Sequence, residues 1–149
     1  MLPPISPHIA AREAATPIDL ALLRSRFDSL ADASDCVIVE GAGGWLAPIS
    51  DTASMADLAA ALSLPVLLVV GLRLGCLNHA LLTRESLAAR GVAFAGWIAN
   101  AIDPHFERAA GNLATLTARL REPPLASVPF LDRGSGTADL REAAGKLSA

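Results

Sequence analysis

The stretch PVLLVVG, residues 65–71, is a short apolar run that begins with a proline and ends with a glycine. Its valines and leucines predict a β-strand, and the lack of any polar side chain indicates that both faces of this strand are buried. Such strands belong to parallel sheets with helices on their faces, because the crossover between parallel strands needs about a dozen residues or more. The stretch therefore predicts an α/β fold.

Three further runs predict strands: DCVIVE at 35–40, VAFAGWIAN at 92–100 and PPLASVP at 123–129. Thr16 followed by Pro17 indicates the N-cap and first turn of a helix, and Ser54 indicates a second N-cap. Amphipathic stretches predict helices over 17–33, 55–63, 77–90 and 106–120, and from about 137 onward. We expect a parallel sheet flanked by helices, with all four strands pointing the same way, in a single α/β domain over residues 1–149.

Composition excludes several classes of protein. The chain has 149 residues, 52% hydrophobic and 18% charged, which is enough for a globular core. Its formal net charge is -3 and it has no basic cluster, so we expect no nucleic-acid partner. No apolar run reaches the ~18 residues that cross a bilayer, and Cys36 and Cys76 have no metal-binding or disulfide spacing. We therefore expect a cytoplasmic protein without a membrane partner.

Polar residues and glycines follow the predicted strands. Glu40 is followed by the turn GAGG at 41–44, and Asn100 ends the third predicted strand. In an open parallel sheet, ligands bind beyond the carboxyl ends of the strands. A carboxylate, a carboxamide and exposed backbone amides there suit a nucleotide and its metal ion. A solvated Glu40 beside an ordinary tight turn remains the alternative.

Two familiar phosphate-binding patterns are missing from these residues. The glycines after Glu40 do not complete the dinucleotide fingerprint, and the pattern G-x-x-x-x-G-K-[ST] does not occur. The only lysine is Lys146. This sequence therefore contains no catalytic lysine of a phosphate loop.

Five blocks of sequence resemble dethiobiotin synthetase in order and spacing: SPHIAA at 6–11, VEGAGGWLAPISD at 39–51, VVGLRLGCLNHALLT at 69–83, GWIAN at 96–100 and VPFL at 128–131. The resemblance implies a P-loop NTPase-like fold and a homodimer. It also implies an ATP- and Mg²⁺-dependent ligase of biotin biosynthesis. In that reaction an amine of 7,8-diaminononanoate captures CO₂ as a carbamate, ATP phosphorylates it, and the second amine closes the ring with loss of phosphate.

The resemblance also implies roles for individual residues. Glu40 is the expected magnesium ligand. The expected nucleotide- and phosphate-binding residues are Glu40, Gly41, Ala42, Gly43, Asn100, Ala101, Pro129, Phe130 and Leu131, with Asn100 recognising adenine. The expected substrate-binding residues are Gly43, Leu74, Gly75, Cys76, Leu77 and Asn78, of which the last five begin a helix whose amides face the substrate carboxylate across the dimer interface. His8, His79 and Arg73 receive no firm role.

The sequence departs from the family pattern at its front. The family's phosphate loop, with its lysine and threonine, would precede Met1, so we expect a C-terminal portion that is incomplete at its N-terminus relative to the family and has little activity alone. Two alternatives remain. One is a non-catalytic dimerising remnant. The other is a related cobyrinate-type amide-forming ATPase, which shares an EGAG-like turn.

Overall fold

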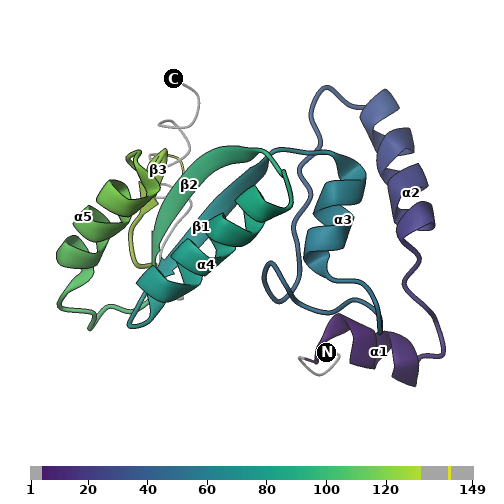
Figure 1. The fold of residues 1–149 in the computed structure, drawn as a ribbon, viewed down its shortest axis with the longest axis horizontal. Helices are drawn as coiled ribbons and strands as arrows, with labels where there is room; N and C mark the ends of the chain where they lie inside the picture. The colour runs from purple at the N-terminus through teal and green to yellow at the C-terminus, as the bar shows by residue number, and fades with distance from the viewer. Residues whose placement is uncertain (1–4, 132–140, 142–149) are drawn as a thin grey trace. The chain divides into compact units, whose positions relative to one another are not determined.

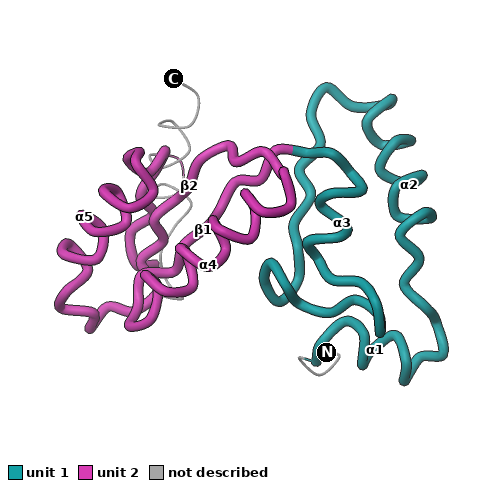
Figure 2. Tube along the Cα trace, viewed as in Figure 1, with its two compact units in different colours: residues 1–64 teal, residues 65–149 magenta. Residues whose placement is uncertain are grey.

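The computed structural model describes residues 5–131 and 141, and the chain divides into two compact units (Figure 2). Unit 1 is Met1–Leu64 and unit 2 is Pro65–Ala149. The expectation of a single domain over residues 1–149 stays a prediction.

Unit 2 contains a parallel sheet of three strands, β1 (Val66–Leu72), β2 (Phe94–Ala101) and β3 (Ala126–Val128), in the order β1-β2-β3 (Figure 1). Consecutive strands of the chain are thus neighbours in the sheet. These three strands and their parallel direction confirm the predicted α/β architecture.

Helices α4 (Cys76–Ala89) and α5 (Ala109–Leu120) form the crossovers between these strands. Their buried side chains meet one face of the sheet in a core of Val70, Leu72, Cys76, Ala80, Trp97, Ala99, Leu116 and Leu120. Trp97 is fully buried, and its indole Nε1 donates a hydrogen bond to the carbonyl of Glu122 at 3.1 Å. Crossovers of the same hand place both helices on the same face, as expected for βαβ units.

Unit 1 contains α1 (Pro7–Glu13), α2 (Leu20–Asp32) and α3 (Met55–Leu62). The predicted N-cap of α3 is confirmed. The backbone amide and hydroxyl of Ser54 donate to the Asp57 carboxylate at 2.7 Å and 2.6 Å. Asp57 thereby satisfies donors at the helix start that have no intrahelical partner.

The predicted start of the first long helix is wrong. Helix α2 begins at Leu20, and Asp19 is its N-cap, with a carboxylate that accepts from the Ala21 amide at 2.8 Å. The hydroxyl of Thr16 instead donates to the carbonyl of Ala14 at 3.1 Å. A carboxylate at Asp19 satisfies the free amides of α2, while Thr16 belongs to the turn that follows α1.

The strand predicted at 35–40 is also wrong. The backbone there is irregular, and the side chains of Ile38 and Val39 are 90% and 43% exposed. A strand needs hydrogen bonds to a neighbouring strand, and this segment belongs to no sheet among the described residues. The sheet therefore has three described strands rather than the expected four. The helix expected from about 137 lies outside the described residues.

Candidate functional site

The carboxyl ends of the three strands in unit 2 lie at one edge of the sheet. Gly71 of β1 is the register partner of Asn100 in β2, and Asn100 is the register partner of Val128 in β3. Asn100 is half-buried, and its carboxamide makes no hydrogen bond within residues 5–131. A half-buried amide without a partner can both donate to a ligand and accept from it.

The other residues predicted to contact the nucleotide base lie next to Asn100 in the chain or directly after β3. Ala101 is half-buried at the end of β2. Beyond β3, Pro129 and Phe130 are exposed and Leu131 is half-buried. The structure thus brings five of the predicted nucleotide-binding residues to one edge of unit 2, and their role in binding stays a prediction.

The predicted substrate-binding residues lie at the start of α4, directly after β1. Gly75 is the N-cap with φ 93°, a left-handed conformation that favours glycine, and no side chain caps this helix. Cys76 is buried, Leu77 is half-buried, and Leu74 and Asn78 are exposed. The first amides of a helix have no intrahelical acceptor, so this helix start can accept an anionic group.

The turn after Glu40 belongs to unit 1. Glu40, Gly41, Ala42 and Gly43 are all exposed. Gly43 has φ 79°, and a Cβ added there would lie 3.1 Å from the Cβ of Ala47. Both the backbone conformation and the close approach therefore favour glycine at this position.

The described residues contain no group of three or more His, Cys, Asp or Glu side chains that could hold a metal ion. The exposed Glu40 carboxylate is a hard oxygen ligand in contact with solvent. Mg²⁺ takes only one or two protein carboxylates and keeps several waters or phosphate oxygens. A single exposed carboxylate fits a magnesium ion only if water or phosphate oxygens supply its other ligands.

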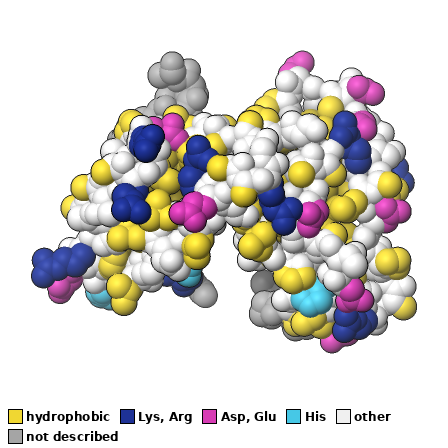
Figure 3. All heavy atoms as spheres, in the orientation of Figure 1, with side chains coloured by type: hydrophobic (Ala, Val, Ile, Leu, Met, Phe, Trp, Pro, Cys, Tyr) yellow, Lys and Arg dark blue, Asp and Glu magenta, His cyan; other side chains and the backbone are white. Residues whose placement is uncertain are grey.

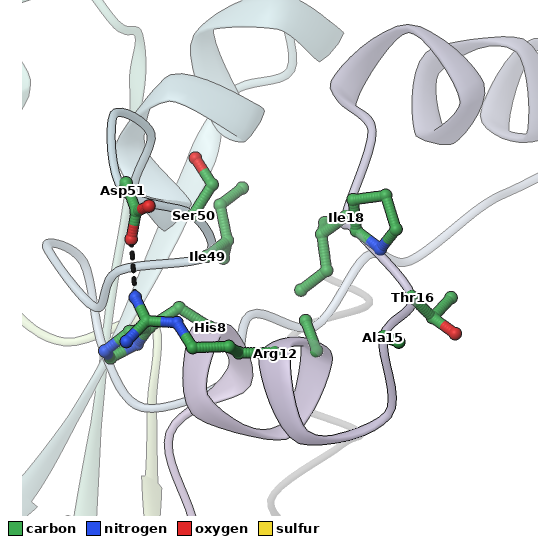
Figure 4. Close-up of a pocket in the computed structure, with 10 residues that line it drawn as sticks. His8, Arg12, Ala15, Thr16, Ile18, Ile49, Ser50 and Asp51 are labelled. Atoms are coloured by element: carbon green, nitrogen blue, oxygen red, sulfur yellow. Dashed lines mark hydrogen bonds and ion pairs between the residues drawn. The ribbon is translucent and has the colours of Figure 1, made fainter.

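A pocket of about 350 Å³ in unit 1 was not anticipated from the sequence (Figure 4). It lies between α1 and the turn at 49–51. Arg12 from α1 donates to the Asp51 carboxylate at 2.7 Å, and the Nδ1 atom of His8 lies 3.3 Å from the carbonyl oxygen of Pro48. Pro7 at the first turn of α1 was the signal for this helix, because proline is favoured at helix starts. These contacts join α1 to the turn within unit 1.

Charged side chains on the face shown in Figure 3 are interspersed with hydrophobic ones. Arginine and acidic side chains both occur there. No helix of the described residues is long and apolar enough to span a bilayer.

The parallel sheet with its helical crossovers defines an α/β protein, and the P-loop NTPase-like class is what its family indicates. A family model described as "AAA domain" matches residues 1–137, and the chain belongs to this family.

The most informative relatives carry the name "ATP-dependent dethiobiotin synthetase BioD". The chain is 55% identical over 128 residues to the one from Aromatoleum aromaticum, an alignment that covers 86% of this chain and 57% of that protein. It is 48% identical over 137 residues to the one from Pseudomonas aeruginosa strain UCBPP-PA14, covering 91% of this chain and 60% of that protein. The one from Ralstonia nicotianae is 51% identical over 133 residues, covering 87% and 57%. The resemblance found in the sequence motifs is confirmed, and the chain spans less than two thirds of the length of these relatives.

Proposed function

We propose that this chain carries the carboxyl-terminal part of a dethiobiotin synthetase, an ATP-dependent ligase of biotin biosynthesis. The observation that carries the proposal is its identity of 46% to 55% with proteins of that name over most of its length. The reaction joins 7,8-diaminononanoate and CO₂ into the cyclic urea of dethiobiotin, driven by ATP. A cytoplasmic homodimer that needs the remaining length of its relatives for full turnover is part of the same proposal.

In this proposal the carboxyl edge of unit 2 holds the nucleotide base. The carboxamide of Asn100 presents a donor and an acceptor, which match the amino group and a ring nitrogen of adenine. Ala101, Pro129, Phe130 and Leu131 supply surface beside the ring. Asn100 is half-buried, and its carboxamide has no hydrogen-bond partner within residues 5–131; both observations support this role.

The two other predicted sites receive the charged parts of the reactants. Glu40 would hold Mg²⁺, which when bound neutralises charge on the phosphates, and the exposed turn of Gly41, Ala42 and Gly43 would lie against the phosphates and substrate. The start of α4, at Leu74, Gly75, Cys76, Leu77 and Asn78, would bind the carboxylate of diaminononanoate through backbone amides and the helix dipole.

A chimera tests the proposal. The chain is joined to the amino-terminal part of the Aromatoleum aromaticum relative that the alignment does not cover, and ADP release is followed with and without diaminononanoate. We expect ADP release that depends on diaminononanoate and CO₂, and Glu40→Gln should raise the magnesium concentration needed for half-maximal rate. A folded chimera without dependent turnover would contradict the proposal and favour a non-catalytic dimerising module. Stimulation by a cobyrinate-type acid instead of diaminononanoate would favour the amide-forming ATPase.

A further inference from the structure

Ile102 follows β2 directly, and its side chain lies on the backbone of Gly71 in β1. A Cβ added to Gly71 would be 2.6 Å from Cδ1 of Ile102 and 3.3 Å from Cγ1. Real Cβ atoms do not approach other carbons this closely, so the isoleucine occupies the space that a side chain at position 71 would need. The absence of a side chain at Gly71 therefore allows Ile102 to pack against the backbone of β1.

This contact places Ile102 on the same face of the sheet as Asn100. Trp97 and Ala99 belong to the core beneath α4 and α5. Because side chains alternate along a strand, Asn100 faces the opposite side. Gly71 is the register partner of Asn100 and shares its face, and Ile102 covers Gly71. An isoleucine and a carboxamide that has no partner in the described part of the chain thus lie together at the carboxyl edge.

The exposure of Ile102 is high for a large apolar side chain held against backbone. It is 44% exposed, and Phe130, two residues beyond the strand partner of Asn100 in β3, is 42% exposed. Apolar side chains therefore lie just beyond the ends of β2 and β3, close to Asn100 near the end of β2. Sites for flat, apolar rings with a polar edge have this composition, with a few polar groups among apolar walls.

We propose that Ile102, seated on the backbone of Gly71, is a binding residue that packs against the nucleotide base whose polar edge pairs with Asn100. The inference rests on the proposed function, because it presumes that ATP binds at this edge. It adds a base-binding residue that the sequence motifs did not indicate.

ATP titrations of the folded chain test the inference. We expect Ile102→Ala to weaken ATP binding by about tenfold, because the buried area of the side chain is lost, and Ile102→Val to weaken it by about twofold. Leu82→Ala is the matched control, since Leu82 is 55% exposed on α4, and its affinity should equal that of the unaltered chain. Circular dichroism checks that each variant is folded.

A double-mutant cycle tests the packing of Ile102 on the backbone of Gly71. Gly71→Ala should weaken ATP binding by about the same factor as Ile102→Ala, because the added methyl group displaces the isoleucine. In the Ile102→Ala background the same glycine substitution should have little further effect, since the crowding atoms are gone. If the effects of the two substitutions on ATP affinity are additive, the proposed packing of Ile102 on Gly71 is overturned.

The ATP affinities of these variants test the role of Ile102 separately from the proposed function. If ATP binds and Asn100→Ala weakens binding while Ile102→Ala behaves like Leu82→Ala, the inference about Ile102 is overturned and the proposed nucleotide edge stands. If the folded chain does not bind ATP, the same titrations are made on the folded chimera, and both are overturned if the chimera does not bind ATP either. Weaker ATP binding in the Ile102, Gly71 and Asn100 variants, with Leu82→Ala unchanged, supports both.

Discussion

The segment at 35–40 and strand β1 have similar sequences and different structures. Both are short and contain a run of branched aliphatic residues, VIV in DCVIVE and VLLVV in VLLVVGL. All seven residues of β1 pair with β2, with one register shift between Val66 and Leu67, whereas the segment at 35–40 belongs to no described sheet and leaves Ile38 90% exposed. An apolar pattern therefore specifies the capacity to form a strand, and the presence of a neighbouring strand decides whether the strand forms.

The largest difference should appear in amide hydrogen exchange. Central amides of β2, such as Ile98 and Ala99, should exchange about a thousandfold or more slowly than those of Ile38 and Val39, because they open only with the unit. Exchange followed by NMR measures both groups in one sample. Equal protection of the two groups would contradict the comparison and indicate that the segment at 35–40 is paired in solution.

The next largest effect concerns side chains of the two regions. Trp97→Ala should lower the free energy of unfolding of unit 2 by about 3–5 kcal/mol, because it leaves a cavity in the core and an unpaired carbonyl at Glu122. Ile38→Ala should change the free energy of unfolding of unit 1 by less than about 0.5 kcal/mol, since this side chain is 90% exposed. Urea unfolding monitored by circular dichroism measures both. A large cost at Ile38 would show that the side chain is buried in solution.

A smaller effect should come from the backbone of β2. Gly96 has φ 118°, and an added Cβ would lie 2.8 Å from Cδ1 of Leu125. Gly96→Ala should destabilise unit 2 by about 1–3 kcal/mol through this strained conformation. Gly111→Ala is the control, because nothing lies within 4 Å of its added Cβ in α5, and it should be neutral or stabilise by up to about 1 kcal/mol. Equal effects at the two glycines in urea unfolding would contradict this account.

The smallest effect concerns a local hydrogen bond in unit 1, at the N-terminal cap of α3. Ser54→Ala should reduce the stability of unit 1 by about 1 kcal/mol, because it removes the hydroxyl from the cap of α3. Ser29→Ala, whose hydroxyl donates to a carbonyl within α2, should change stability by less than about 0.5 kcal/mol. Thermal unfolding of both variants measures the difference. A cost for Ser29→Ala equal to that for Ser54→Ala would argue against a special role of the cap.

Some features of the nucleotide edge could be predicted from the sequence, and others depend on tertiary contacts. Asn100 and the residues after β3 could be placed at one edge from the sequence, because parallel strands align their carboxyl ends. The relation of Ile102 to Gly71 could not be predicted, because it arises from the lateral register of two strands and the rotamer of one side chain. The contacts of Arg12 with Asp51 in unit 1 also join residues that no local pattern relates.

By itself, the sequence determined the α/β class, the three strands of unit 2, the cap at Ser54 and the family motifs, because each is encoded by residues close together in the chain. Tertiary structure alone decided that 35–40 is not a strand, that Asp19 rather than Thr16 caps α2, and that Ile102 rests on Gly71. The physical reason is that strand hydrogen bonds and close packing need partners distant in the chain. Such partners are chosen only when the elements assemble.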